Sequence, residues 1–296
     1  MRACVIFNPA AKGQKAERFR RCLATIAAGC DLKRTTGPGD ARRLAAVAIQ
    51  DGYDTLIAAG GDGTLNEVLN GMGDMADGFE RARLGVLPLG TINVFAREIG
   101  LPTNPDAAWP ILQRDNERRI DLASIETGDP GNSSRTYFIQ LAGAGLDARA
   151  IQLVNWSLKK KIGPLAYVAA GLKAMTEEQA MLTISDGTRT ATGQLVLVGN
   201  GRRYGGEFQI FPDAEVTDGW LHACVFPQVD WRTLIRSGFT LLLTKKLPRT
   251  SVIRLRAKSF TLIGQATRHF EVDGELGLPL PARFNLQPAG LRVLVP

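Results

Sequence analysis

The segment Gly60-Gly61-Asp62-Gly63-Thr64-Leu65-Asn66-Glu67 decides the fold of the first part of the chain. The apolar run Thr55–Ala59 before it predicts a buried strand. The residues after the glycines predict a helix that begins at Thr64 or Leu65 and ends at Gly71 in the left-handed conformation. A strand, a glycine turn and a helix N-terminus in this order indicate an anion site, because free N–H groups and the helix dipole point at the turn.

Two side chains of this segment suit phosphate chemistry. Thr64 can cap the helix and donate its hydroxyl, whereas the carboxylate of Asp62 belongs beside phosphates mainly if a divalent cation mediates. Asn66 stands where a dinucleotide fingerprint would have its third glycine, and Gly63 lacks the following Lys of a Walker A loop. Taken alone, the segment leaves both a phosphate site and an ordinary strand-to-helix connection open.

A second segment repeats this pattern. Leu84–Leu87 predicts a strand, Gly90-Thr91 a turn, and the residues from about Asn93 a helix. In a parallel sheet both turns lie at the carboxyl edge, where open α/β sheets bind ligands. Other elements of this region also end at that edge, and the residues at their ends are Asn8, Lys12 and Thr36. These turns together favour a convergent phosphate pocket.

The first third of the chain alternates between strand and helix. Ala3–Phe7 predicts a strand, residues 14–28 a helix, and residues 31–36 a short strand. Asp40 is expected to cap a helix over Ala41–Gln50. Short strands separated by helices predict an α/β domain with a parallel sheet.

The pattern changes after about Asp121, where strands become frequent. They are expected over residues 136–141, 181–185, 194–199, 221–226, 252–255, 259–263 and 269–272. The Asp-Gly pairs at 186–187, 218–219 and 273–274 are typical of hairpin turns. Helices are expected over residues 151–178 and 231–246. We therefore predict an α/β domain over residues 1–121 and a mostly antiparallel β-sandwich over residues 122–296, whose last strand can return to the first domain.

Composition narrows the class of protein further. The chain has 36 Lys and Arg against 29 Asp and Glu, a net charge of +7, which suits either anionic partners or a solvated surface. Its 4 Cys lack metal-type spacing and its 2 His disfavour a His-based zinc site. No run reaches the roughly 18 to 20 apolar residues of a membrane span. We expect a cytoplasmic protein that touches a membrane only at its surface.

Four motifs together carry a family resemblance. Gly60–Glu67, Leu87–Arg97, Pro212–Leu221 and Val272–Glu275 resemble, in the same order, motifs of the bacterial diacylglycerol kinase and sphingosine kinase superfamily. The resemblance spans nearly the whole chain. It implies an ATP-dependent lipid kinase with an N-terminal domain similar to NAD kinase and phosphofructokinase, a following β-sandwich, and catalysis in the cleft between them.

The resemblance also assigns roles by position. It implies ATP contacts at Asn8, Thr36, Gly61, Asp62, Gly63, Thr64, Leu65, Asn66, Glu67 and Thr91. Asp62 would serve the catalytic magnesium, and Glu275 would be the general base for the lipid hydroxyl. A structural magnesium would lie in the turn of Glu215, Asp218 and Trp220, with a side-chain oxygen from Asp218 and backbone carbonyls from the other two.

One departure and several alternatives stand beside these assignments. Val94 occupies a position where diacylglycerol kinases of this group often have Asp. A kinase of a soluble acceptor, as NAD kinases are, and a catalytically silent lipid- or nucleotide-binding protein both remain open. Without the resemblance, Asp218-Gly219 and Asp273-Gly274-Glu275 indicate hairpin turns first.

Surface partners are less well defined by the sequence. Lys159-Lys160-Lys161 beside Trp156 can be a solvated face or a contact to anionic lipid headgroups. Phe239–Leu243 has the same two interpretations, with burial preferred. Nucleic-acid binding rests on charge alone because no aromatic-basic motif accompanies it. An edge strand in either domain could support a homodimer.

Overall fold

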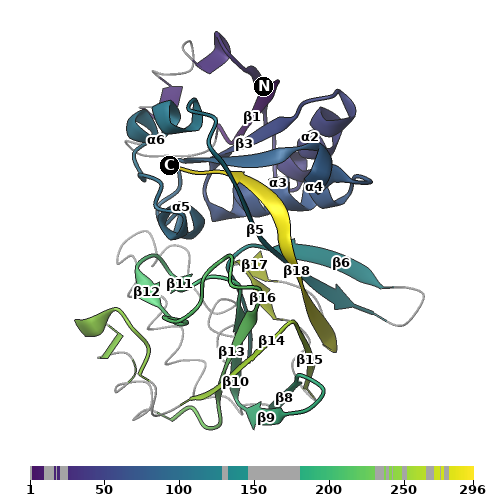
Figure 1. Ribbon diagram of the computed structural model, residues 1–296, viewed down its shortest axis with the longest axis vertical. Coiled ribbons are helices and arrows are strands. Elements are labelled where there is room, and N and C mark those ends of the chain that lie inside the picture. Colours follow the sequence, from purple (N-terminus) through teal and green to yellow (C-terminus); the bar gives the residue numbers. More distant parts are fainter. Residues whose placement is uncertain are drawn as a thin grey trace. The chain divides into compact units, whose positions relative to one another are not determined.

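The computed structural model of the 296-residue chain consists of two compact units. It describes residues 2–9, 17, 19–20, 26–128, 133–145, 181–230, 237, 240–241, 243–248, 252–264, 270–273, 275–276 and 280–296 (Figure 1). The first unit comprises residues 1–122, 205–207 and 287–296, and the second comprises residues 123–204 and 208–286. The helices expected at 14–28, 151–178 and 231–246 lie wholly or largely outside the described residues, as do Lys12 and the 156–161 segment.

The first unit is built on a parallel sheet. Its strands lie in the order β2 (Asp31–Arg34), β1 (Ala3–Phe7), β3 (Thr55–Gly60), β4 (Arg83–Pro88) and the end of β18 (Ala282–Leu294). Neighbouring strands of this order are parallel to one another. Every residue of β3 is buried, as expected for a strand covered on both faces. The predicted parallel sheet is confirmed.

Five helices of this unit fall within the described residues: α2 (Asp40–Gln50), α3 (Asp62–Gly73), α4 (Gly78–Arg81), α5 (Val94–Glu98) and α6 (Pro105–Leu112). Figure 1 shows α2, α3 and α4 grouped beside the parallel strands. Gly71 lies inside α3, and a Cβ there would overlap the backbone carbonyl of Arg42 on α2. The prediction that Gly71 ends the helix is therefore wrong, because this glycine serves close contact between two helices.

Two predicted helix caps are also wrong. Helix α3 begins at Asp62 with Gly61 as its extended N-cap residue, so Thr64 lies inside the first turn. Helix α2 begins at Asp40, and the left-handed Gly39 precedes it without a side-chain cap. The carboxylate of Asp40 instead accepts hydrogen bonds from Thr36, because it lies one residue past the cap position.

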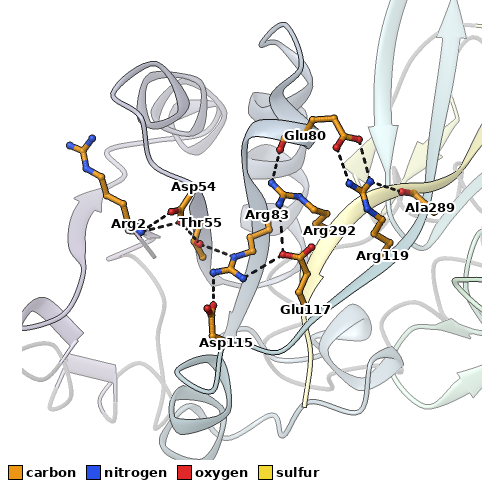
Figure 2. Close-up of polar contacts among 10 residues, drawn as sticks. All are labelled: Arg2, Asp54, Thr55, Glu80, Arg83, Asp115, Glu117, Arg119, Ala289 and Arg292. Carbon is orange, nitrogen blue, oxygen red and sulfur yellow. Dashed lines mark hydrogen bonds and ion pairs between the residues drawn. The ribbon is translucent and has the colours of Figure 1, made fainter.

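Ion pairs tie β5 (Glu117–Thr127) and β18 to the end of the sheet where β3 and β4 begin (Figure 2). At its centre the partly buried Arg83 donates to Thr55 Oγ1 at 3.0 Å and pairs with Asp115 and with Glu117. The network continues through Asp54, Glu80, Arg119, Ala289 and Arg292. It holds the two strands that run on into the second unit.

The second unit contains antiparallel strands in two sheets. The first sheet continues from β18 through β15 (Ser259–Gly264) and β8 (Leu182–Ser185) to β9 (Thr190–Gly193), while β5 pairs with β6 (Ser134–Phe138). The second has the order β14 (Ile253–Ala257), β13 (Leu221–Phe226), β10 (Leu195–Gly199), β7 (Leu141–Gly145), β16 (Glu271–Val272) and β17 (Glu275–Leu276). A short ribbon joins β11 (Arg203–Tyr204) and β12 (Phe208–Gln209). The sequence pattern does not predict β5 or β9.

Apolar side chains from both sheets form the core of the second unit. Phe284 of β18 contacts Phe138 and Phe270, with ring centroids 6.2 and 5.9 Å apart. The other face of the second sheet is covered by a smaller apolar cluster that includes Leu197, Cys224, Phe211 and Ala214. The predicted sandwich is therefore confirmed.

The three Asp-Gly pairs have different outcomes. Asp186-Gly187 joins β8 to β9, and Asp273 begins the hairpin between β16 and β17, as predicted. Asp218-Gly219 instead precedes β13 in the connection from β12, and these two strands are not paired. In the described part of the chain, no helix is long and apolar enough to cross a membrane.

Candidate functional site

The two glycine turns of the first unit touch each other through their backbones. The N–H groups of Leu89 and Gly90 both donate to the carbonyl of Gly60, at 2.8 and 3.1 Å. A Cβ on Gly90 would lie 2.5 Å from the Cα of Gly61, which is closer than real side chains approach. Only glycine fits at position 90 without moving the other turn, so the ends of β3 and β4 form one continuous backbone surface.

Asn93 fixes the second turn and is a residue that the motif reasoning missed. Its Oδ1 accepts from the N–H of Gly90 at 3.0 Å, and its Nδ2 donates to the carbonyl of Gly90 at 2.7 Å. The residue is buried and left-handed, with φ of 52°. Asn tolerates that conformation better than most residues, which is the signal that could have identified it.

The Asp62 carboxylate joins the two turns. Its Oδ1 accepts a hydrogen bond of 2.8 Å from the backbone N–H of Val94, the first residue of α5. Asp62 is itself the first residue of α3. The turn after β3 therefore holds an acidic side chain toward the turn after β4, and a main-chain donor fixes the orientation of that side chain.

The start of α3 provides backbone donors for an anion. The bonding within the helix begins with Leu65 N–H to the carbonyl of Gly61 at 3.1 Å, and the N–H groups before it lie in the first turn, where a helix offers no acceptor of its own. The strand order places the topological switch point between β1 and β3. Asn8 lies there, with its N–H on the carbonyl of Ala59 at 3.2 Å.

Glu67 contacts α2. Its two carboxylate oxygens accept from the N–H groups of Gly39 at 2.9 Å and Ala41 at 3.0 Å, so Glu67 caps the start of α2 from the neighbouring helix. The Thr36 N–H and hydroxyl bind Asp40 Oδ2 at 2.8 and 2.9 Å. The Thr36 backbone N–H, followed by the side chain of Arg43, lowers the pKa of Asp40. Glu67 thereby sets the position of the turn that carries Thr36.

The remaining predicted nucleotide contacts follow the carboxyl ends of their strands. Thr36 and Thr91 are exposed, after β2 and β4. Leu65 is only 2% exposed, so its side chain belongs to the core and only its backbone can face a ligand. Asn66 Oδ1 accepts from Asn70 Nδ2 at 3.1 Å within α3. The predicted contacts are thus brought to one edge of one sheet, although several side chains have structural partners there.

In the second unit, Glu275 lies on a hairpin that Asp273 fastens to β7. Strand β17 pairs with β16, with Glu275 opposite Val272. The Asp273 carboxylate accepts three backbone N–H bonds of 2.9 to 3.1 Å, from Ile139, Gln140 and Leu141. Asp273 is left-handed, with φ of 49°. The sequence marks Asp273 only as a turn residue, because its partners are more than 130 residues away.

The predicted magnesium turn binds its own protein donors. Asp218 Oδ2 accepts from the Glu215 N–H at 3.0 Å and from His222 Nε2 at 2.8 Å, and Oδ1 accepts from the Trp220 N–H at 2.9 Å. These bonds use three of the about four lone pairs of a carboxylate. The Glu215 carboxylate pairs with Arg202. The Glu215 carbonyl, one of the predicted ligands, accepts the N–H of Asp218 at 3.1 Å. A magnesium ion would therefore have to share both Asp218 and this carbonyl with donors of the protein, so the turn as it stands is a poor fit for magnesium.

Comparisons with known proteins agree with this architecture. Residues 2–125 match the family model of the diacylglycerol kinase catalytic domain, and residues 140–295 match that of the YegS C-terminal NAD kinase beta sandwich-like domain. A Staphylococcus saprophyticus protein named diacylglycerol kinase is 30% identical over 308 residues, covering 100% of this chain and 95% of the relative. A Staphylococcus epidermidis protein of the same name is 32% identical over 300 residues, covering 97% of this chain and 90% of the relative.

A solved structure has the same fold. It is described as a diacylglycerol kinase from Bacillus anthracis, and it aligns with a TM-score of 0.76 at 24% sequence identity. The alignment covers 100% of this chain and 97% of the other. At this identity the likeness supports the fold alone.

Proposed function

Because the chain belongs to the diacylglycerol kinase family, we propose that it transfers the γ-phosphoryl group of ATP to a hydroxyl of a lipid acceptor such as diacylglycerol or a sphingoid or ceramide-like lipid. The observation that carries the proposal is the contact between the two glycine turns, with the Asp62 carboxylate fixed across them by Val94 N–H. This arrangement combines backbone donors and one acidic group at a sheet edge, as phosphoryl transfer requires.

The glycine turns would bind the phosphates of the nucleotide. Gly60, Gly61 and Gly90 carry no side chains that could block the approach of a phosphate to the backbone. The first turn of α3 adds N–H donors and the positive end of its dipole. Asn8, Thr36 and Thr91 follow β1, β2 and β4 at this edge and would contact the rest of the nucleotide.

Asp62 is the residue we assign to hold the catalytic magnesium ion. The carboxylate oxygens of Asp62 suit a hard cation. The hydrogen bond from the Val94 N–H fixes this carboxylate without introducing another charge. Magnesium, when bound, neutralises charge on the transferring phosphates. The main-chain bond orients Asp62 before any ligand arrives, which limits the reorganisation required on binding.

Glu275 is the group we assign to remove the proton from the acceptor. The hydroxyl oxygen forms the new P–O bond, the bond from the γ-phosphorus to the bridging oxygen breaks, ADP leaves, and the Glu275 carboxylate takes the proton. Asp273 supports this role by fastening the hairpin to the start of β7 through three backbone bonds.

The test is a phosphate-transfer assay with labelled ATP and magnesium. Acceptors would be diacylglycerol, sphingoid base, ceramide and phosphatidylglycerol in mixed vesicles, with NAD as a soluble acceptor. We expect transfer to at least one lipid, and the lipid that is phosphorylated identifies the acceptor class. Transfer to NAD alone would replace the lipid kinase with a soluble-acceptor kinase, and no transfer to any acceptor would favour a silent binding protein.

Two conservative variants test the assigned residues. Asp62→Asn retains an oxygen that can accept the Val94 N–H, so it removes charge while preserving the contact between the turns. We expect it to lose activity by about 100-fold or more with an unchanged melting temperature, since a charged group near the phosphates is lost. Glu275→Gln should lose activity by about 100-fold or more, as for a general base. Full activity in either variant would refute the role of that residue.

A further inference from the structure

The connection Phe211–Trp220 before β13 is a packed part of the second unit. The Phe211 ring lies on β10, where a Cβ on Gly199 would overlap it. Phe211 and Ala214 are buried in the smaller apolar cluster. The N–H of Phe211 donates to the carbonyl of Arg202 at 3.2 Å, and that of Ala214 to the carbonyl of Phe211 at 3.0 Å. The connection therefore has an apolar base and an ordered backbone before any ion is considered.

His222 binds the acidic side chain at the end of this connection. Its Nε2 lies 2.8 Å from Asp218 Oδ2, and the two side chains are only 14% and 22% exposed. Because the carboxylate can only accept, Nε2 donates the hydrogen bond. The His222 ring also contacts Phe211, with centroids 6.2 Å apart. His222 thus joins the last turn of the connection to its buried beginning.

Two positively charged arginine side chains contact the same connection. Arg202 Nε donates to the carbonyl of Ala214 at 2.6 Å, and its guanidinium pairs with Glu215 at 2.5 Å. Arg256 lies opposite His222 in the register of β13 and β14, with its guanidinium 5.4 Å from the centre of the Trp220 ring. The family resemblance assigns a magnesium ion to the backbone carbonyls of Glu215 and Trp220, so these side-chain contacts place positive charge beside that site. The Glu215 carbonyl itself accepts the N–H of Asp218 at 3.1 Å.

We propose that His222 and Arg202 hold this connection in place of a divalent cation, so that it folds and stays folded without magnesium. A magnesium ion would compete with the His222 donor for Asp218 and would lie near the guanidinium groups of Arg202 and Arg256. It would also have to give up tightly held water for a carboxylate that offers one remaining lone pair. The other lone pairs of Asp218 already accept hydrogen bonds from the N–H groups of Glu215 and Trp220 and from His222.

Thermal unfolding without nucleotide tests the proposal separately from phosphoryl transfer. The Asp62→Asn variant serves as the background, because it removes the carboxylate assigned to magnesium in the first unit. We expect its melting temperature to be the same in excess EDTA and in millimolar MgCl2. Calorimetric titration of the same protein with MgCl2 alone should show no binding heat. A rise in melting temperature with MgCl2, or binding of one ion per chain, would overturn the proposal.

A matched pair of variants tests the part played by His222. His222→Gln retains an N–H that can reach Asp218, whereas His222→Phe keeps a ring beside Phe211 but has no donor. We expect the Phe variant to melt at least about 2 °C below the Gln variant, since the carboxylate loses a partner. Equal melting temperatures for the two variants would show that the hydrogen bond does not hold the connection, and would also overturn the proposal.

Discussion

Glu67 provides a direct test of how the nucleotide site is positioned. Its carboxylate accepts the N–H groups of Gly39 and Ala41 at the start of α2, at 2.9 and 3.0 Å. The loss of a helix cap costs about 0.5–2 kcal/mol, and a hydrogen bond to a charged group contributes about 1.5–3 kcal/mol. Since the Gly39 bond is exposed, we expect Glu67→Ala to lower the free energy of unfolding by about 2 kcal/mol. Glu67→Gln retains one acceptor oxygen and should lose about half as much.

The kinetic consequence follows from the position of Thr36. The turn that carries Thr36 continues into α2, whose start Glu67 binds. Loss of the cap therefore lets the Thr36 turn, one side of the proposed nucleotide site, move more freely. It removes no group that takes part in the reaction. We expect the KM for ATP to rise several-fold in both Glu67 variants, with a smaller change in kcat, because binding and not the transition state loses support.

Urea unfolding and steady-state kinetics of the same preparations measure both effects. The matched control is Asp74→Ala, which removes a carboxylate that also links α3 to α2, through Arg42. Both side chains of that pair are more than 40% exposed, so its loss should cost at most about 1 kcal/mol and leave the KM unchanged. Wild-type stability in Glu67→Ala, together with a loss confined to kcat, would refute the capping role and favour direct action at the phosphates.

Three further perturbations have distinct expected outcomes. Gly90→Ala should raise the KM for ATP by at least about tenfold, because its Cβ would lie 2.5 Å from the Gly61 backbone. The control Gly29→Ala, at a position with open space around it, should have wild-type kinetics in the same assay. Arg83→Met should lower the free energy of unfolding by about 2 kcal/mol in urea, since Thr55, Asp115 and Glu117 all lose their bonds to the partly buried guanidinium. Burial raises the pKa of Cys4 from 9.0 to about 12, above its unfolded value, so its stabilisation is present below pH 9.0 and is lost as pH rises toward about 12. Urea midpoints across that range should fall less steeply in a Cys4→Ala variant, and identical slopes would contradict this assignment.

The elements that could be predicted are those whose own residues specify them. Strands β1, β3 and β4 are continuous apolar runs, and β13 has the predicted bounds Leu221–Phe226 because its residues are nearly all apolar. Strand β5 is missed because it begins Glu117-Arg-Arg, three exposed charged residues. Arg119 and Glu117 gain their partners from α4, β4 and β18, so no local pattern identifies this strand.

The same distinction applies to the candidate site. The glycines at 60, 61 and 90 can be recognised in the sequence as places of close packing. A Cβ at position 60 would overlap the Thr64 side chain, and a Cβ at position 90 would overlap the Gly61 backbone. The roles of Glu67 and Asp273 depend on N–H groups 26 to 28 and 132 to 134 residues away, which only the packed structure brings within reach. Asn93 is intermediate, because its partner is three residues away and its left-handed backbone is favoured by its own side chain.

The departure at Val94 affects charge and leaves the geometry of the site intact. The group that binds Asp62 is the backbone N–H of residue 94, so any residue except proline can supply it. An Asp at this position would add a second carboxylate near the proposed phosphate site. With valine there, Asp62 is the one acidic side chain that, among the described contacts, bridges the two turns. One fewer negative charge at this edge also lowers the repulsion that an anionic nucleotide meets before a cation neutralises it. Valine at this position is therefore compatible with the proposed phosphoryl transfer, because the orientation of Asp62 comes from the main chain.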